Sequence, residues 1–289
     1  MKRLQMLPEQ LTFEGEFGAE INSFLPFVHW LWGTGELGRR KIVTYPGMAP
    51  FYCFLRSDQI IEATRPRCYV PPAARPHWLP TRDDHGPRDC SRESFPDYRS
   101  LFANDLFDTE KPVLMLHNKY CTEWGGPPVN FIPVELLAEA LATLTDRFQI
   151  FYSRPGIAPG RNDYSADHQP DHDLQERSVL ASFPETQIFE DLAADLSPTY
   201  TYNQLKLMLY AVTHFHVTTQ GGNAHLAALF SGSTILIYHR AGRELSHSYR
   251  FGHFATAATP PPTLLIAQNP EEFSVALGAL SKQAFSLAN

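Results

Sequence analysis

The sequence predicts an α/β fold with Rossmann-like parallel sheets. Two observations lead to this prediction. Short apolar runs of strand length alternate with segments of helical hydrophobic spacing over the carboxy-terminal two-thirds of the chain, and one of these strands leads through a glycine turn directly into a helix. Strands separated by helices of this length require parallel pairing and right-handed crossovers. With 289 residues, 43% of them hydrophobic, the chain is long enough for two such domains.

The carboxy-terminal elements follow one another in regular order. We expect strands at 112–117, 149–152, 186–189, 214–218, 234–238 and 263–266. We expect helices at 134–148, 202–212, 223–230 and 270–280, the last with a proline at its start. These elements predict a Rossmann-like domain over residues 109–289.

The first third of the chain has a less regular pattern. Strands are expected at 11–13 and 41–45, on either side of a helix from about residue 19 to residue 32. Residues 65–105 are rich in Pro, Arg and Asp, and we interpret them as a long surface loop. The change of pattern predicts a separate domain over residues 1–108.

Composition excludes several classes of protein. The net charge of −7 argues against a nucleic-acid binder, which would need clustered Lys and Arg. The four cysteines are scattered without a C-x-x-C pair, which favours a reducing compartment, and the amino terminus lacks the apolar stretch of a secretory signal. The longest apolar run, 24–32, is interrupted by Pro26 and His29 and is too short to span a bilayer. We therefore expect a cytoplasmic protein without a transmembrane segment.

The glycine turn Gly221-Gly222-Asn223 is the main candidate for a binding site. Glycine lets the backbone approach a ligand, and the following helix start offers unpaired N–H groups and a positive dipole end, which suit a diphosphate. The alternative is a tight strand–helix turn that needs glycine only for its backbone conformation. Because the segment lacks the G-x-G-x-x-G pattern, a nicotinamide cofactor is not expected.

Three segments resemble a known family. The run from Gly222 to Phe230 (GNAHLAALF), followed by a strand from Ser233, resembles the donor-binding turn of GT-B glycosyltransferases, and their heptosyltransferase-like group (GT9-like) is nearest. The run 116–124 (LHNKYCTEW) resembles that group's strand end, where polar residues and a lysine face the donor phosphates. Phe17-Gly-Ala-Glu20, followed by Pro26, resembles the glycine–acid turn whose carboxylate is the general base.

The resemblance implies two Rossmann-like domains in a GT-B-like arrangement, with parallel sheets facing a cleft and the amino-terminal domain on the acceptor side. It implies a glycosyltransferase of carbohydrate biosynthesis that moves a sugar from a nucleotide-sugar donor to a glycan or other hydroxyl acceptor, inverting and independent of metal. The expected donor-binding residues are Asn118, Lys119, Arg154, Gly221, Gly222, Asn223, His225, Arg243 and Glu244. Glu20 is the first choice for the catalytic base and Glu16 the second; each also fits a simple helix-capping acid.

A metal site is considered at one place only. Asp171-His172-Asp173 fits the D-x-D pattern that holds a divalent cation, but it lies in a polar, proline-containing segment, which favours a solvated loop. His214 and His216 share one face of a strand and are interpreted as packing residues, because a third ligand is missing. No cofactor is therefore required, and the nucleotide-sugar acts as co-substrate.

Two other functions stay open. One is a GT-B-fold NDP-sugar epimerase, and the other is a non-catalytic nucleotide- or glycan-binding protein. Hydrolase, zinc-protease and NTPase functions find no support, because the sequence has no G-x-S-x-G, H-E-x-x-H or GK[ST] motif.

Overall fold

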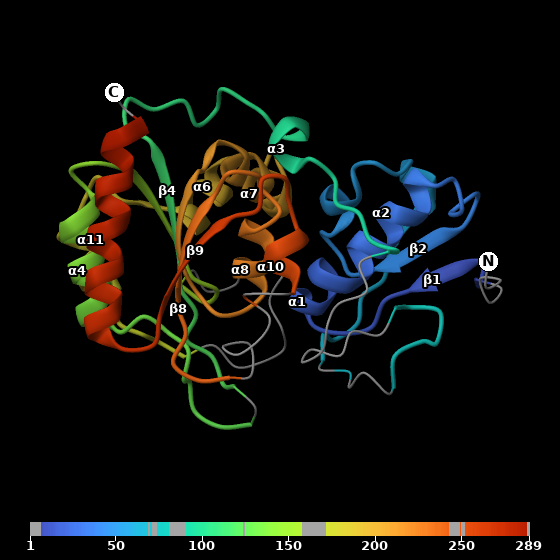
Figure 1. The fold of residues 1–289 in the computed structure, drawn as a ribbon, viewed down its shortest axis with the longest axis horizontal. Helices are drawn as coiled ribbons and strands as arrows, with labels where there is room; N and C mark the ends of the chain where they lie inside the picture. The colour runs from blue at the N-terminus through green and yellow to red at the C-terminus, as the bar shows by residue number, and fades with distance from the viewer. Residues whose placement is uncertain are drawn as a thin grey trace.

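The described part of the chain contains two sheets, and every strand pairing in both of them is parallel. The computed structural model describes residues 7–68, 70, 74–80, 91–123, 125–157, 172–242, 249 and 252–287 (Figure 1). The smaller sheet has the order β1-β2-β3, and the larger has the order β6-β5-β4-β7-β8-β9. The α/β class and the two parallel sheets predicted from the sequence are confirmed.

The strands of the larger sheet lie within one or two residues of their predicted positions. Strand bounds are β1 Gln10–Thr12, β2 Lys41–Thr44, β3 Ile60–Glu62, β4 Val113–His117, β5 Gln149–Ser153, β6 Gln187–Ile188, β7 Phe215–Thr219, β8 Thr234–Tyr238 and β9 Thr263–Ala267. All side chains of β4 are buried, as expected for a parallel strand covered on both faces. Strand β3 was not predicted, because its three residues are too few to show a hydrophobic period.

The helices are more numerous than the sequence predicted. Their bounds are α1 Phe17–Ala19, α2 Leu25–Gly33, α3 Tyr98–Leu101, α4 Val134–Leu144, α5 Arg177–Ala181, α6 Phe189–Asp195, α7 Tyr202–Val212, α8 Gly222–Ala227, α10 His253–Thr256 and α11 Pro270–Leu287. A π-helix, η1 (Glu20–Phe24), joins α1 to α2, and short 3₁₀ turns are η2 (Ala49–Tyr52) and η3 (Ser57–Gln59). The single helix expected from about 19 to 32 is therefore a composite, in which Leu25 N–H donates to Glu20 O.

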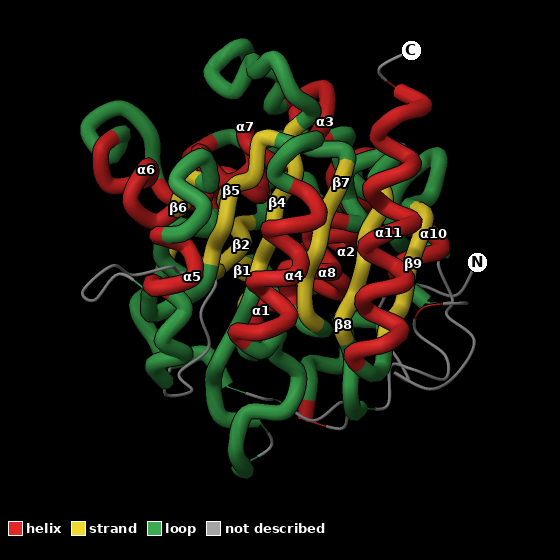
Figure 2. Tube along the Cα trace, turned by 90° about the vertical axis from the view of Figure 1, so that its left-hand side faces the viewer, coloured by secondary structure: helices red, strands yellow, loops and turns green. Residues whose placement is uncertain are grey.

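Helices cover the larger sheet on both faces. Figure 2 shows α4 and α11 lying across one face, and Figure 1 shows α7 and α8 between the other face and the amino-terminal sheet. One buried hydrophobic cluster includes Leu137 of α4 and Leu277 of α11. A second cluster extends without interruption from Phe17 and Phe51 of the amino-terminal half to Leu205 of α7. The two halves therefore share a core on this side of the larger sheet.

Several elements fix the contact between the two halves. Helices α1 and η1 contact α8, and η2 contacts α7. Asn203 Nδ2 of α7 donates a hydrogen bond of 2.8 Å to Gly47 O. The two halves therefore pack directly against one another at α1 and α8.

The described residues between 65 and 105 include several that are buried, unlike the expected surface loop. Leu79 and Tyr98 are buried, and Tyr98 belongs to α3, which contacts α7. The Arg99 guanidinium donates hydrogen bonds of 2.6 to 2.9 Å to three backbone carbonyls of the carboxy-terminal half, those of Ala211, Thr213 and Ser231. The prediction of a surface loop was wrong for these residues, because their aromatic and guanidinium groups anchor the segment to α7 and to the loop after α8.

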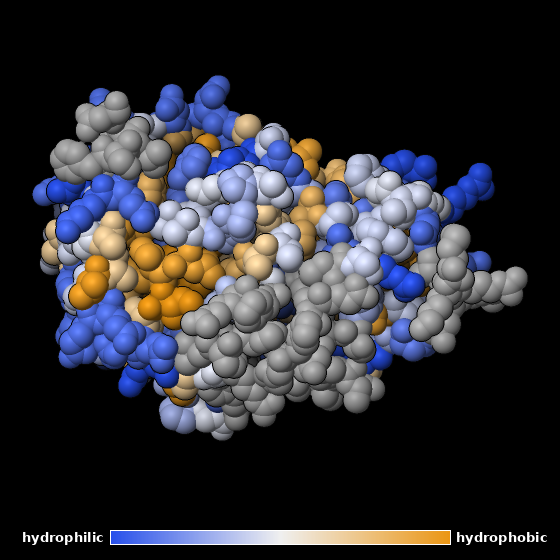
Figure 3. Space-filling model, viewed as in Figure 1, coloured by the Kyte–Doolittle hydropathy of each residue, from blue (hydrophilic) through white to orange (hydrophobic). Residues whose placement is uncertain are grey.

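Strand β9 forms one edge of the larger sheet, and its residues 264–266 are only partly buried. Figure 3 shows apolar surface in this region of the carboxy-terminal half. Among the described residues, no helix combines the length and the apolar character that crossing a membrane requires.

Candidate functional site

The strand order of the larger sheet identifies where a ligand is expected. Counted from β4, the order β6-β5-β4-β7-β8-β9 is 3-2-1-4-5-6, the order of doubly wound nucleotide-binding domains. Such folds bind ligands outside the carboxyl ends of the strands where the order reverses, which here is between β4 and β7. Lys119 follows β4, and the turn Gly221-Gly222 follows β7. Topology and the glycine motif therefore point to the same edge of the sheet.

The Lys119 ammonium lies beside the glycine turn. Its Nζ is 3.2 Å from Gln220 Oε1 and 3.2 Å from Glu123 Oε1. A Cβ atom added to Gly221 would lie 3.8 Å from the same nitrogen. The Lys119 side chain keeps 18% of its surface exposed. The structure therefore brings together Lys119 and the glycine turn, which are about a hundred residues apart in the sequence.

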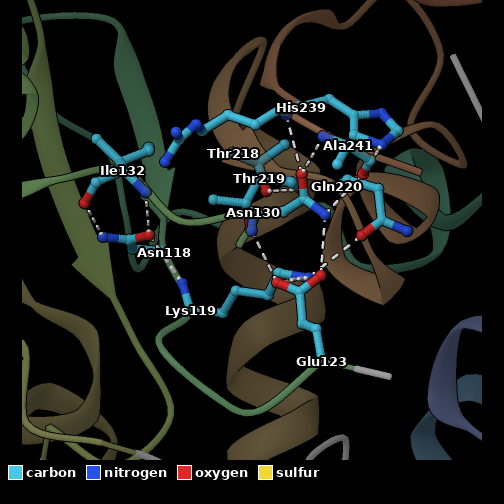
Figure 4. A network of polar contacts seen from close by, with 11 residues as sticks. Asn118, Lys119, Glu123, Asn130, Ile132, Thr218, Thr219, Gln220, His239 and Ala241 are labelled. Carbon is cyan, nitrogen blue, oxygen red and sulfur yellow. Dashed lines mark hydrogen bonds and ion pairs between the residues drawn. The ribbon is translucent and has the colours of Figure 1, made fainter. Parts of the chain in front are cut away.

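Asn118 shapes the loop that carries Lys119 (Figure 4). Its Oδ1 accepts hydrogen bonds of 2.9 Å from Lys119 N and from Ile132 N, and its Nδ2 donates one of 2.9 Å to Ile132 O. Asn118 is fully buried. Its amide therefore closes the base of the 118–132 loop, whereas the sequence placed it among the donor-binding residues.

Glu123 and Asn130 connect this loop to the one after β8. Asn130 N and Nδ2 donate to the two carboxylate oxygens of Glu123, each at 2.9 Å. Asn130 Nδ2 also donates to Ala241 O, and its Oδ1 accepts from Arg240 N and Ala241 N. Burial alone would raise the pKa of Glu123, but the Lys119 charge and the Asn130 hydrogen bonds outweigh it and hold this pKa below its ordinary value. Because β7 lies between β4 and β8, the connection spans the end of β7 where the glycine turn begins.

Sequence reasoning missed both of these residues. Glu123 has a weak signal, because it lies four positions after a lysine. Asn130 has none, because its partners Arg240 and Ala241 are 110 and 111 residues away along the chain.

The structure explains why both residues of the turn are glycines. Gly221 has a φ of +138°, which side chains rarely adopt. At Gly222 an added Cβ would lie 2.4 Å from Phe17 Cδ1 and 3.1 Å from Gly18 N. On the other side of the contact, a Cβ on Gly18 would lie 3.4 Å from His225 Nδ1. The turn thus allows α1 to pack directly against α8, and His225 lies at this contact. The conformational explanation of the glycines therefore holds whether or not the turn binds a phosphate.

The Asn223 side chain points to the sheet. Its Nδ2 is hydrogen-bonded to Nε2 of His117, the last residue of β4. Burial lowers the pKa of His117 well below its ordinary value, with further lowering by the charges of Lys206 and Lys119. His117 is therefore neutral, and it accepts through Nε2 if Asn223 donates.

A buried polar cluster lies next to α1. Lys206 of α7 is fully buried, and its Nζ is 5.8 Å from the ring centroid of Phe17 and 5.7 Å from that of Tyr202. Nearby, Glu190 Oε1 accepts hydrogen bonds from Ser153 Oγ at 2.6 Å and from Tyr202 OH at 3.3 Å. The only sequence signal for Lys206 is its place at a core-facing position of an amphipathic helix.

The two candidate bases have different surroundings. Glu20 is 0% exposed, and its Oε2 lies 2.8 Å from Arg67 Nη2. Its Oε1 accepts hydrogen bonds from Tyr52 OH at 2.8 Å and from Thr44 Oγ1. Glu16 lies at the start of α1 and is partly exposed. Glu20 is therefore part of a buried ion pair, while Glu16 retains access to solvent.

Arg154 also belongs to a buried ion pair. Its Nε donates to Glu176 Oε1, and its Nη1 donates to Pro155 O at 2.9 Å and to His172 O at 3.1 Å. These partners all come from the segment after β5, and none belongs to the glycine turn. The contacts of Arg154 are those of a structural residue, and its predicted donor-binding role stays a prediction.

Of the remaining predicted site residues, only Asp173 lies within the described part of the chain. Arg243, Glu244 and Asp171 lie outside the described residues. Asp173 Oδ1 accepts a hydrogen bond of 2.9 Å from Gln175 N in a local turn. Within the described ranges, no group of three or more His, Cys, Asp or Glu side chains is arranged to hold a metal ion.

Comparison with known protein families finds none that matches the sequence, and comparison with characterised proteins also finds no match. Among solved structures, three of the wall teichoic acid polymerase TagF are similar. One, of a variant, aligns with 84% of this chain and 50% of the polymerase chain at 11% identity and a TM-score of 0.33. A second, of a variant soaked with CDPG, aligns with 89% of this chain and 51% of the polymerase chain, at 11% identity and a TM-score of 0.34. The third aligns with 89% of this chain and 52% of the polymerase chain, at 10% identity and a TM-score of 0.33. The chain spans about half the length of the polymerase chains, and a similarity this low assigns it neither an activity nor a substrate.

Proposed function

We propose that the chain binds the diphosphate of a nucleotide-type ligand at the carboxyl edge of the larger sheet, between β4 and β7. The observation that carries this proposal is the Lys119 ammonium, which lies beside Gly221 at the point where the strand order reverses. A lysine supplies a compact positive charge for phosphate oxygens, and this one is partly exposed to solvent.

The reaction that we propose is glycosyl transfer with a nucleotide-sugar donor, in a GT-B-like arrangement of the two halves. The acceptor hydroxyl oxygen forms a bond to the anomeric carbon while the bond from that carbon to the diphosphate breaks, and a carboxylate takes the hydroxyl proton. The electron pair of the broken bond leaves with the nucleoside diphosphate, whose charge Lys119 offsets without a metal. The heptosyltransferase-like resemblance of the glycine turn supports this reaction class.

Glu16 is the better candidate for the base in this scheme. The ion pair between Glu20 and Arg67 uses the carboxylate that the resemblance favoured, and burial keeps an acceptor hydroxyl away from it. Glu16 lies one residue before Phe17 and two before Gly18, which touch the glycine turn. It is therefore the partly exposed acid next to the proposed diphosphate site.

The burial of Glu20 also favours a second function, one that needs no catalytic base. If Glu16 does not act as a base, the chain is a nucleotide- or glycan-binding protein without turnover. Incubation with nucleotide-sugars and candidate acceptors separates the two, because only a transferase releases nucleoside diphosphate in the presence of acceptor.

The binding proposal is tested by thermal shift with UDP, GDP, ADP and CMP, with Mn²⁺ or with EDTA. A ligand that binds only the folded state stabilises it, by about 2.7 kcal/mol at a hundred times its Kd. We expect one nucleotide to raise the Tm equally with and without EDTA. The shift should disappear in Lys119→Met and remain in Lys111→Met, whose Nζ donates to Thr145 O instead. Absence of a shift with every nucleotide would overturn the proposal.

A further inference from the structure

We propose that Glu123 is a positioning residue, which holds the Lys119 ammonium beside the glycine turn and is itself held by Asn130. The inference rests on the proposed diphosphate site and names a residue that the sequence did not assign to it. Glu123 would act through Lys119, without touching the ligand.

The contacts of Glu123 define its position on both sides. Its Oε1 accepts from Asn130 N at 2.9 Å and lies 3.2 Å from Lys119 Nζ, and its Oε2 accepts from Asn130 Nδ2 at 2.9 Å. The Glu123 side chain is only 7% exposed. A buried carboxylate with these partners has one place to lie, whereas the four-carbon stem of a lysine has many. Glu123 therefore restricts Lys119 to the neighbourhood of Gly221.

Asn130 connects the Glu123 carboxylate to a second strand end, outside the loop that carries Lys119. Its amide is bound to the backbone of Arg240 and Ala241, which follow β8, through three hydrogen bonds of 2.9 to 3.1 Å (Figure 4). At the other end of the loop, Asn118 is bound to the backbone of Ile132. These contacts fix the position of the Glu123 carboxylate relative to the ends of β4 and β8, the strands on either side of β7.

The alternative is that Glu123 competes with the ligand for the ammonium. An ammonium group has three N–H donors, and the contacts to Glu123 and Gln220 use two of those of Lys119. Among the described residues no further contact uses the third, which can therefore bind a phosphate oxygen without breaking either contact. Because Asn130 holds both oxygens of Glu123, the carboxylate can stay in place when the ligand arrives. The geometry therefore favours positioning over competition.

A double-mutant cycle tests the proposal, with affinity measured by calorimetry for the nucleotide that shifts the wild-type Tm. Glu123→Gln should weaken binding about tenfold, the loss expected when one charge-assisted contact of the ligand is misplaced. In a Lys119→Met background the same change should have no further effect, because the residue through which Glu123 acts is gone. The exposed Glu135→Gln removes the same charge elsewhere and should leave affinity unchanged.

Two outcomes would overturn the proposal. Tighter binding by Glu123→Gln would show that the carboxylate competes with the ligand. If Glu123→Gln weakened nucleotide binding equally in the wild-type and Lys119→Met backgrounds, the loss would reflect a general structural defect. If Glu123→Gln does not fold, Glu123→Asp, which keeps the charge but shortens the reach, takes its place with the same expected outcomes.

A second measurement needs no ligand. Acetic anhydride labels lysine amines, and peptide mass spectrometry reports the rate at Lys119 relative to Lys111 in the same sample. We expect Glu123→Gln to increase this ratio several-fold, because the ammonium loses the partner that holds it; an unchanged ratio would contradict positioning. If the wild type binds no nucleotide, the proposed function fails, while this ratio still decides whether Glu123 positions Lys119.

Discussion

At the scale of single residues, the largest departure from the sequence-based expectation is the burial of charge. Glu20 and Arg67 form an ion pair in which both side chains are at most 3% exposed. Such a pair can be neutral for stability as a whole, but the loss of one partner leaves the other charge buried and unpaired. A carboxylate in this environment shapes the amino-terminal half, even though its sequence context resembles that of a catalytic base.

The roles of Glu20 and Glu16 can be separated by substitution. Glu20→Gln should lower the free energy of unfolding by about 3 to 5 kcal/mol, because it removes one charge of a buried ion pair. Glu16→Gln, at a partly exposed position, should change it by less than about 0.5 kcal/mol and, if the proposed reaction is correct, reduce transfer by about 10²- to 10⁴-fold. Urea denaturation and product formation measure the two effects. A Glu20→Gln protein with normal stability and no activity would return the base assignment to Glu20.

At the scale of elements, the contact between α1 and α8 depends on the absence of a side chain at Gly222. An alanine there would place Cβ 2.4 Å from Phe17 Cδ1 and 3.1 Å from a backbone nitrogen, so that α1 has to shift. We expect Gly222→Ala to destabilise the protein by about 1 to 3 kcal/mol, the usual cost of overpacking. In a Phe17→Leu background the additional cost should be smaller, since the clashing ring is gone.

Gly278 provides the matched control for this change. It lies inside α11, and within the described part of the chain no atom beyond its own helical turn lies within 4 Å of the place that an added Cβ would take. Gly278→Ala should therefore stabilise the protein by up to about 1 kcal/mol, through the higher helix propensity of alanine. Equal effects of the two substitutions in thermal denaturation would contradict close packing of α1 against α8.

At the scale of the whole molecule, a buried histidine links stability to pH. Burial lowers the pKa of His216, on β7, to about 3, with further lowering by the charges of Arg99 and His214. Because this folded-state pKa lies below the unfolded value of about 6.5, the unfolded chain binds a proton between these two pH values that the folded chain does not. The contribution of His216 is therefore fully present above pH 6.5 and is lost as the pH falls toward 3.

This linkage predicts a difference between the wild type and His216→Leu. As the pH falls from 6 to 4, the wild type should lose about 1.4 kcal/mol more per pH unit than the variant. Between pH 7 and 9 the two should lose or gain stability in parallel, because the imidazole is neutral in both states. Urea denaturation across this range measures both slopes, and parallel curves below pH 6 would exclude a neutral His216 in the folded protein.

The elements of the larger sheet could be predicted from the sequence because their signals are local. The apolar run that became β4 and the helical spacing that became α7 are each contained in one short segment, and β7-turn-α8 follows from a strand, two glycines and a helix. The resemblance to GT-B glycosyltransferases implied that Lys119 lies near the glycine turn, and the structure gives the reason, since both follow the carboxyl ends of neighbouring parallel strands. Nothing comparable identified β3, whose three residues gain their structure from pairing with β2.

The sequence by itself thus determined the α/β class and the parallel sheets, while the proximity of Lys119 to the glycine turn was implied by the family resemblance. Only the tertiary structure decided which polar groups are accessible and which are buried in pairs. It enclosed Glu20 with Arg67 and Arg154 with Glu176. It also paired Glu123 with Lys119 and connected Glu123, through Asn130, to the backbone that follows β8. The reason is physical: hydrophobic period is a property of neighbouring residues, whereas the fate of a charge depends on partners that the chain brings together only when it folds.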